Sequence, residues 1–420
     1  MFLQVSGRAS VIFSNFGPHS SEIVPLALKN KDTIYTLQFG LVCLSSFLFS
    51  ASFNMLIPEL PAYLSNMGGA AYKGLIIALF TLTAGGSRPF SGKLTDTIGR
   101  VPVMAVGSIV CFVCGFLYPV LTTVAGFLLL RLVHGFSTGF KPTATAAYVA
   151  DLVPATKWGE AMGIHGVCFS TGLAIGPAIG SAITAHYSIN ILFYCSSLFA
   201  LLSIVILANM KDTLPDKQRF RLAHLRIGKN DIFDKRVIPS VVVIFLSYVS
   251  YGAILTVIAD WSLHLGTANK GLFFMVFTLT SLLIRFVAGK VSDRHGRVPI
   301  LKISLSLLAI STFMIALANT SWLLMFASGV YGIATGMLSP TATAWTADLS
   351  DPAQRGKAMA TMYIALEAGI GLGALLAGSL FIEDFAMIPV VFYWCTAITL
   401  LSLIYLQFLY KPGRQKSAVA

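Results

Sequence analysis

A few ionisable residues lie inside stretches of chain that are otherwise apolar, and these residues could do chemistry there. Glu367 lies in Leu366-Glu-Ala-Gly-Ile-Gly-Leu-Gly373, near the middle of its apolar stretch. A charge at the centre of a bilayer costs about 3 kcal/mol on insertion scales, so such a residue faces a cavity or a partner. Because burial disfavours the charged form of a carboxylate, Glu367 is a candidate proton carrier. A structural ion pair and contact with a substrate are alternative roles for it.

Three further residues are candidates for proton coupling or substrate binding. Arg131 and His134 lie one turn apart on a predicted helix that contains Arg131-x-x-x-Gly135-x-x-x-Gly139. Histidine titrates in a physiologically useful range, although it is also common as a structural residue. Asp260 lies near the outer end of another apolar stretch, so we rank it below Glu367 and Arg131.

A polar loop that occurs twice carries the second group of candidates. Arg88-Pro-Phe-Ser-Gly-Lys-Leu-Thr-Asp-Thr-Ile-Gly-Arg-Val-Pro102 is matched without a gap by the segment Arg285–Pro299, and eight of the fifteen positions are identical. In each copy an aspartate precedes an arginine by four residues. The candidate gating residues are Gly92, Asp96, Gly99, Arg100, Gly289, Asp293, Gly296 and Arg297, with Asp151 and Asp348 downstream. A role in topology and loop geometry alone is the alternative.

The elements that position these residues are long apolar stretches. The 420-residue chain is 56% hydrophobic and 11% charged, which excludes an ordinary soluble globule. About 20 apolar residues suffice to cross a bilayer. Twelve stretches of that kind occur, near residues 35–57, 71–91, 102–119, 122–149, 159–185, 188–209, 237–260, 270–288, 300–318, 321–346, 357–381 and 387–409.

The repeat extends over both halves of the chain. Pro142-Thr-Ala-Thr-Ala146 is matched by Pro340-Thr-Ala-Thr-Ala344, and Gly159-Glu-Ala-Met162 by Gly356-Lys-Ala-Met359. Such duplication is typical of membrane transporters. We therefore predict two membrane units, at 33–210 and 237–410, joined by a cytoplasmic linker at 211–236. Cytoplasmic tails are expected at 1–32 and 411–420, the first of them poorly ordered.

The net charge of +12 reflects topology rather than nucleic-acid binding. If both ends are cytoplasmic, 23 of the 29 lysines and arginines lie in cytoplasmic segments; two more, Lys73 and Lys270, lie in outer loops, and four lie within the membrane, namely Arg88, Arg131, Lys141 and Arg285. That asymmetry follows the positive-inside rule. Cys111-x-x-Cys114 lies within a predicted span with no further ligands nearby, so we expect neither a disulfide nor a metal site.

At these motifs the chain resembles the major facilitator superfamily, and the resemblance covers about residues 33–410. The family carries G-x-L-x-D-x-x-G-R between its second and third helices, matched here by Gly92, Leu94, Asp96, Gly99 and Arg100. The resemblance implies an all-α membrane protein with twelve transmembrane helices in two pseudo-symmetric six-helix bundles. It also implies that Arg100 pairs with Asp151 and Asp96 lies against the start of the eleventh helix when the cytoplasmic side is closed. Asp293, Arg297 and Asp348 would form the symmetric set.

Gly172-x-x-x-Gly176-Pro177-x-x-Gly180 resembles the motif of the family's proton-driven exporters. Physically it is a glycine ridge with a proline kink, expected to pack against a neighbour in the other half. Arg131-x-x-x-Gly resembles the family's fourth-helix signature, whose arginine contributes to proton coupling. The sugar-porter signatures are absent from 209–220 and 409–416.

The sequence therefore predicts a proton-coupled antiporter that exports a small organic molecule. Its expected partners are the substrate, protons and the lipid bilayer. We expect a monomer in the plasma (inner) membrane, with no cofactor beyond the proton gradient. No catalytic constellation is visible, so we expect no enzyme activity. An uptake symporter and a lipid flippase remain alternative interpretations.

Overall fold

Twelve long helices make up most of the structure, a computed structural model that describes residues 34–153, 157–226, 233–351, 355–382 and 384–409. The tails expected at 1–32 and 411–420 lie outside the described residues. The first half contains α1 (Leu37–Asn54), α3 (Lys73–Thr97), α4 (Arg100–Leu117), α5 (Val124–Leu152), α6 (Trp158–His186) and α7 (Ile189–Ala208). The second half contains α8 (Ile238–His264), α9 (Leu272–His295), α10 (Arg297–Ala316), α11 (Ser321–Leu349), α12 (Arg355–Leu380) and α13 (Met387–Ile404). Short elements are α2 (Leu60–Asn66), η1 (Ala70–Tyr72), η3 (Leu222–Leu225), η5 (Lys235–Val237) and η7 (Tyr405–Leu409).

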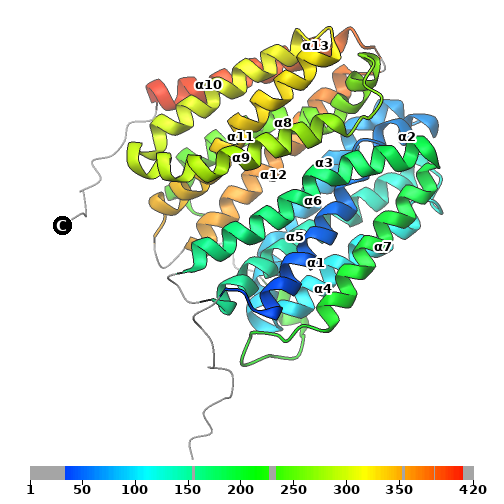
Figure 1. The fold of residues 1–420 in the computed structure, drawn as a ribbon. Helices are drawn as coiled ribbons and strands as arrows, with labels where there is room; N and C mark the ends of the chain where they lie inside the picture. The colour runs from blue at the N-terminus through cyan, green and yellow to red at the C-terminus, as the bar shows by residue number, and fades with distance from the viewer. Residues whose placement is uncertain (1–33, 154–156, 227–232, 352–354, 383, 410–420) are drawn as a thin grey trace, which may run out of the picture.

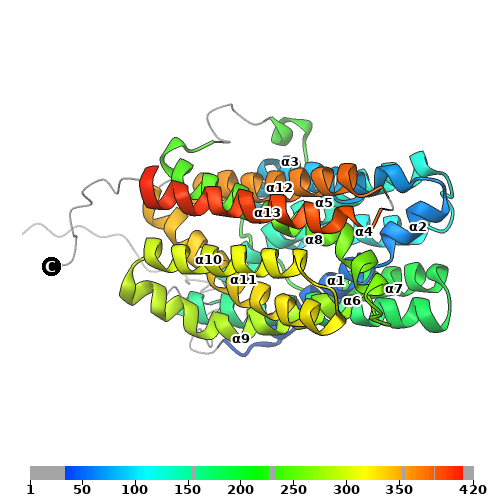
Figure 2. The same ribbon diagram turned by 90° about the horizontal axis from the view of Figure 1, so that it is seen from above.

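The two halves lie side by side, and the predicted pair of six-helix bundles is confirmed. In Figure 1 the helices coloured blue to green form one group, and those coloured green to red form the other. Seen from above in Figure 2, the axes of the long helices of both groups are roughly aligned. The segments that follow α3, α5, α7, α9 and α11 all lie at one end of the molecule. We call this the motif end, because it holds both copies of the duplicated loop, and we call the other the opposite end.

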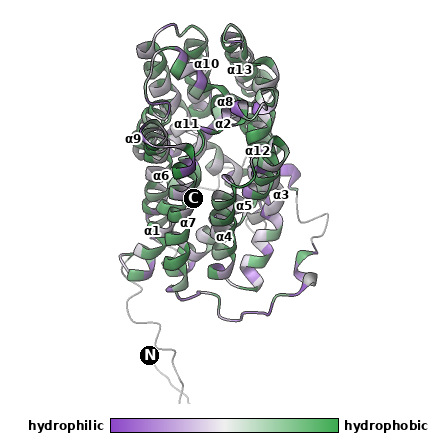
Figure 3. Ribbon diagram, turned by 90° about the vertical axis from the view of Figure 1, so that its right-hand side faces the viewer, coloured by the Kyte–Doolittle hydropathy of each residue, from purple (hydrophilic) through white to green (hydrophobic). Residues whose placement is uncertain are grey.

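The helices have the length and hydropathy of membrane spans. Among the described residues, ten helices are long and apolar enough to cross a membrane, by length and composition only. The other two of the twelve are α5, which carries Arg131, His134 and Lys141, and α9, whose apolar part is Leu272–Arg285. In Figure 3 hydrophobic residues (green) predominate along the helices, and the hydrophilic linker (purple) runs below them. Large apolar side chains such as Leu198, Trp322 and Phe408 point outward, as expected for a lipid-facing surface.

Local sequence signals explain where the helices begin and turn. Thr123 and its repeat counterpart Thr320 cap α5 and α11, each through its side-chain oxygen. Gly99 and Gly296 have φ angles of +123° and +86° between the two helices of each duplicated loop. Residues with a Cβ rarely adopt these angles, so the loop requires glycine at both positions.

The repeat in the sequence is also a repeat of packing. A Cβ added at Gly135 on α5 would lie 2.0 Å from the carbonyl oxygen of Phe80 on α3. A Cβ at the counterpart Gly332 on α11 would lie 2.2 Å from that of Phe277 on α9. In each half, close backbone contact therefore depends on a glycine at the same repeat position.

Candidate substrate cavity and gates

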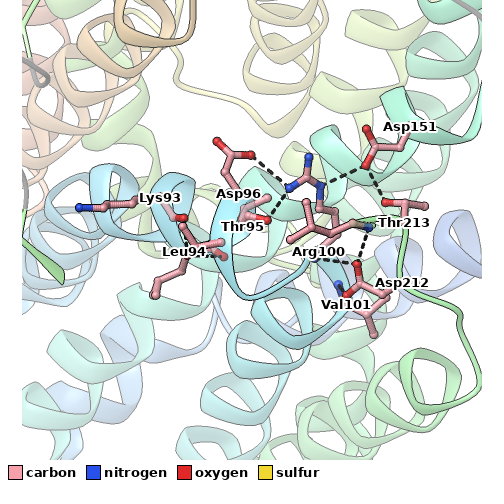
Figure 4. A network of polar contacts seen from close by, with 11 residues as sticks. Lys93, Leu94, Thr95, Asp96, Arg100, Val101, Asp151, Asp212 and Thr213 are labelled. Atoms are coloured by element: carbon pink, nitrogen blue, oxygen red, sulfur yellow. Dashed lines mark hydrogen bonds and ion pairs between the residues drawn. The ribbon is translucent and has the colours of Figure 1, made fainter. Parts of the chain in front are cut away.

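Arg100 holds the duplicated loop of the first half together (Figure 4). Its Nε donates to Asp151 Oδ2 at 3.0 Å, and its NH1 donates to Asp96 Oδ1 at 3.2 Å and to the carbonyl of Thr95 at 2.5 Å. These bonds tie the end of α3 and the start of α4 to the end of α5. Asp96 is otherwise exposed, and Gly92 lines the cavity described below. The expected contact of Asp96 with the start of α12 stays a prediction, since residues 352–354 lie outside the described residues.

The linker adds a residue to this network that sequence reasoning missed. Asp212 accepts hydrogen bonds from the backbone of Arg100 at 3.3 Å and of Val101 at 3.1 Å, at the first turn of α4. A carboxylate at a helix N-terminus is favoured by the helix dipole. Thr213 donates to the same Asp151 oxygen as Arg100, at 2.6 Å. No periodic pattern could have indicated these contacts, because they join residues about 60 to 110 positions apart.

The second duplicated loop repeats the geometry of the first. Arg297 Nε donates to Asp348 Oδ2 at 2.9 Å, and its NH1 contacts Asp293 and also donates to Ser292 Oγ at 2.9 Å. Gly289 lies within α9, and Gly296 forms the turn. The structure thus brings the predicted charged residues of each loop together, within one half in each case.

A cavity of about 1020 Å³ lies between the two halves. It extends along α3 from Ile77 to the motif end at Asp96 and Thr97, and it is open there, where Lys93 and Arg226 are exposed. The second half contributes Tyr251, Leu255, Lys357, Met359, Ala360, Tyr363, Glu367 and Ile370. A cavity of this size suits an organic molecule of drug size.

Glu367 lies in the cavity, where it pairs with Arg88. The distance from Arg88 NH2 to Glu367 Oε1 is 2.9 Å, and the pair joins α3 of the first half to α12 of the second. The Arg88 guanidinium also lies 4.6 Å from the ring of Tyr363. Arg88 was not among the predicted site residues, although its place in the membrane and at the head of the duplicated loop was a usable signal.

The remaining coupling candidates lie in different surroundings. Arg131 lines the cavity, donates from Nε to the carbonyl of Ile76 at 2.9 Å, and stacks on Phe80 with its guanidinium 4.5 Å from the ring centre. His134 is fully buried behind it, bonded to Tyr118 at 3.0 Å and to the thiol of Cys111. It is not part of the cavity wall, so the structure does not bring it to Glu367.

Asp260 belongs to a set of ion pairs that join the halves at the opposite end. Lys73 Nζ lies 2.8 Å from Asp260, and Lys270 Nζ lies 2.9 Å from Glu59. The two lysines occupy equivalent repeat positions, and each pairs with an acid of the other half. All four side chains are at least four-fifths buried. The charge pattern of the sequence predicts outer loops for both lysines and does not indicate their partners.

Close backbone contact completes the closure of the opposite end. A Cβ at Gly74 would lie 2.5 Å from the carbonyl oxygen of Ala374, and one at Gly378 would lie 2.3 Å from the Gly74 nitrogen. No side chain fits between α3 and α12 here. The cavity is therefore closed at the opposite end and open at the motif end.

The glycine ridge of α6 differs from the expectation. A Cβ at Gly172 would lie 2.6 Å from a carbonyl oxygen of α1, and one at Gly180 would lie 2.0 Å from that of Met55, the residue that follows α1. The ridge therefore packs within its own half, and Gly176 faces α1 too. Glycines four apart share one helix face, and that face is turned to α1. The contact with the other half is made by Pro177 and Ala178 instead. A Cβ at Gly271 would lie 2.2 Å from the Pro177 carbonyl, and Asn269 donates to the carbonyl of Ala178 at 3.0 Å.

Solved transporter structures share this fold. The crystal structure of the human organic anion transporter MFSD10 has a TM-score of 0.68 and 21% identity, over 88% of this chain and 98% of that one. That of a D-xylose-proton symporter has a TM-score of 0.74 and 16% identity, over 89% and 97%.

Curated relatives are similar over most of their length. An uncharacterized MFS-type transporter of Methanocaldococcus jannaschii is 26% identical over 81% of this chain and 90% of the relative. Multidrug resistance protein 2 of Bacillus subtilis is 26% identical over 78% and 84%, and quinolone resistance protein NorA of Staphylococcus aureus is 25% identical over 83% and 89%. The model of one family, described as Major Facilitator Superfamily, matches residues 42–258 and 240–419. With two matched halves around one central cavity, the chain belongs to the Major Facilitator Superfamily of membrane transporters.

Proposed function

We propose that this chain is a secondary active transporter that exports a small organic molecule by alternating access, in exchange for protons. The observation that carries the proposal is a cavity between the halves that is closed at one end and open at the other. In alternating access such a cavity opens to one end at a time, so the contacts that close one end must break when those that close the other end form. The multidrug and quinolone resistance names of the relatives support export.

The positive-inside rule supports a cytoplasmic motif end. Basic residues concentrate in the helix ends, loops and linker there, and they include Lys93, Lys157, Arg226 and Lys357. Both chain ends would then be cytoplasmic and the cavity would open to the cytoplasm, as loading of an exported substrate requires. We place the protein in the cell membrane as a monomer.

The charged residues of the duplicated loops are proposed to gate the motif end. Arg100 and Arg297 each bind two carboxylates of their own half, which keeps both loops in a defined shape. When the halves close at this end, the loops would meet the start of the helices opposite. Opening of the other end would break Lys73–Asp260 and Lys270–Glu59.

Glu367 is the proposed proton site. Its carboxylate is buried in the cavity. In alternating access, α12 of one half would move relative to α3 of the other, which carries its partner Arg88. The titratable groups around it are Arg88 on α3, Tyr363 on α12, and Tyr248 and Tyr251 on α8. Separation of the Arg88 pair removes the charge that stabilises the carboxylate and so favours proton uptake.

Proteoliposomes with an imposed pH gradient test the coupling. Glu367→Gln cannot bind a proton, so it should lose uphill transport, keep downhill exchange and show a flat pH dependence. Asp384→Asn, which removes an exposed carboxylate, is the control and should behave as the native protein. Uphill transport by Glu367→Gln with native pH dependence would rule the residue out as the carrier.

The Arg88–Glu367 pair also favours a second form of coupling, symport. A substrate that binds Arg88 in place of Glu367 leaves the carboxylate without its cationic partner. The carboxylate would then bind a proton more readily, so substrate and proton would bind together. Antiport needs the reverse, a substrate that binds while the Arg88–Glu367 pair is intact and leaves before Glu367 takes up a proton. Accumulation of substrate along an inward proton gradient would establish symport and exclude export by antiport.

A further inference from the structure

The cavity carries more positive than negative charge. Its charged lining residues are five bases and two acids, namely Arg88, Lys93, Arg131, Arg226, Lys357, Asp96 and Glu367. A cleft with one predominant sign of charge and walls of low dielectric concentrates ligands of the opposite sign. The excess of three positive charges therefore favours negatively charged ligands.

Both carboxylates of the cavity already have a cationic partner. Glu367 pairs with Arg88 at 2.9 Å in the interior, and Asp96 pairs with Arg100 at 3.2 Å near the mouth. In the interior, a cationic ligand would have to displace Arg88 from Glu367. Breaking a buried pair leaves an uncompensated charge, so this competition disfavours cations.

Among the described bases that line the cavity, Arg131 is the fully buried one without an acidic partner. Among the described residues, no carboxylate lies within 4.0 Å of its guanidinium, although the side chain is 98% buried. Its hydrogen bonds go to the carbonyl of Ile76 at 2.9 Å and to the Tyr118 hydroxyl at 3.4 Å. A guanidinium has five N–H donors, so others are left for a ligand. Arginine binds carboxylates and phosphates through two parallel hydrogen bonds.

The walls near Arg131 are apolar and aromatic. Phe80 lies beneath the guanidinium, and Phe53, Phe169 and Tyr251 belong to the same lining. We propose that the cavity selects organic anions, with an aromatic or aliphatic body against these rings and a carboxylate, sulfonate or phosphonate group at Arg131. The proposal names the substrate class of the transporter proposed above and rests on that function.

Three matched probes test the selection: 2-naphthoate, 2-naphthamide and (2-naphthylmethyl)trimethylammonium, which share a ring system and differ in charge. Binding is measured by calorimetry on the full chain in nanodiscs of zwitterionic lipid. The anion should bind at least about tenfold more tightly than the amide, as expected for hydrogen bonds to a charged group, and the cation should bind least.

Two variants and one control locate the anion site. Arg131→Gln should weaken binding of the anion about tenfold and leave the amide unchanged. Lys357→Gln, nearer the mouth, should weaken the anion by a smaller factor that shrinks as salt is added. Lys302→Gln makes the same charge change outside the cavity lining and should have no effect. If Arg131→Gln fails to fold, Lys357→Gln carries the test.

Equal or tighter binding of the amide or the cation would overturn the proposal, as would a loss in Arg131→Gln that is equal for the anion and the amide. Uptake of the probes into proteoliposomes separates this failure from that of the proposed function. Anion binding without uptake of any probe would overturn transport and leave the anion site standing. Uptake of the cation alone would support transport and overturn anion selection.

Discussion

Replacing Asp260 by Asn should open the end of the transporter that is closed in this structure. The substitution removes one partner of a buried ion pair and leaves Lys73 charged beside the ring of Phe381. Breaking such a pair in the interior costs about 3–5 kcal/mol. In the state that is open at this end, Lys73 meets water and the loss is close to zero, as for exposed pairs.

The closed state therefore loses about 3 kcal/mol relative to the open one, even at the lower limit. Since 1.4 kcal/mol corresponds to a factor of ten, the equilibrium should shift about a hundredfold toward the open state. The double variant Lys73→Asp with Asp260→Lys restores the pair with its charges exchanged, and it should recover most of the shift.

The shift can be followed by labelling a cysteine from the side of the opposite end. Ile57 lines the cavity near that end and is buried in this structure. In a background without native cysteines, Ile57→Cys should react faster with a membrane-impermeant maleimide when Asp260→Asn is present. Asp351→Asn is the matched control, because Arg236–Asp351 is an exposed pair within one half. Unchanged labelling with Asp260→Asn, or no recovery in the double variant, would refute the gating role of this pair.

Two further substitutions test the packing and the linker. Gly180→Ala should lower the unfolding temperature and cost about 1–3 kcal/mol, because its Cβ would lie 2.0 Å from the backbone oxygen of Met55; Gly163→Ala, with open space around it, should have no such effect in the same melting experiment. Asp212→Asn removes the charge at the N-terminus of α4 and should cost about 1 kcal/mol in unfolding free energy, measured against the exposed control Asp216→Asn.

Each of these two predictions has an outcome that contradicts it. Equal melting temperatures for the two glycine variants would show that α1 and α6 can move apart without cost. If Asp212→Asn and Asp216→Asn unfold alike, the linker contact does not stabilise the duplicated loop.

Hydropathy and duplication were enough to predict the helices, because both are local properties of the chain. The twelve apolar stretches correspond to the twelve long helices, and Gly99 and Gly296 of the duplicated loops fall at positive φ angles. The family resemblance, rather than spacing, predicted the pairing of Arg100 with Asp151 and the symmetric set of Asp293, Arg297 and Asp348; the pairing of Arg100 with Asp96 was not predicted. In the structure, that geometry is present in both halves.

The partners across the two halves could not be predicted, because they depend on how the bundles dock. Glu367 was identified from the free-energy cost of a charge at the centre of a bilayer. Its partner Arg88 could not be identified in this way, because it lies 279 residues away along the chain. Lys73 was interpreted as a loop residue, since the first residue of a helix near a surface carries no signal that it will be buried. The α6 glycines were assigned to the wrong neighbour because periodicity fixes which residues share a face but not which helix the face meets.

The differences between the two repeats locate the specific function of the chain. Residues with a structural or gating role recur at equivalent positions, as Gly135 and Gly332 do under the same carbonyl contact and as Lys73 and Lys270 do at the closed end. Two charges of the cavity interior do not recur, whereas Arg88 is matched by Arg285. Glu367 stands where the first half has Ser170, and Arg131 stands where the second half has Ser328. Symmetric parts can serve the exchange of access between two ends. Coupling to a proton gradient and selection of a substrate of one charge need groups that occur in one half only. The acid on α12 and the base on α5 are therefore where this transporter would differ from relatives that share its fold.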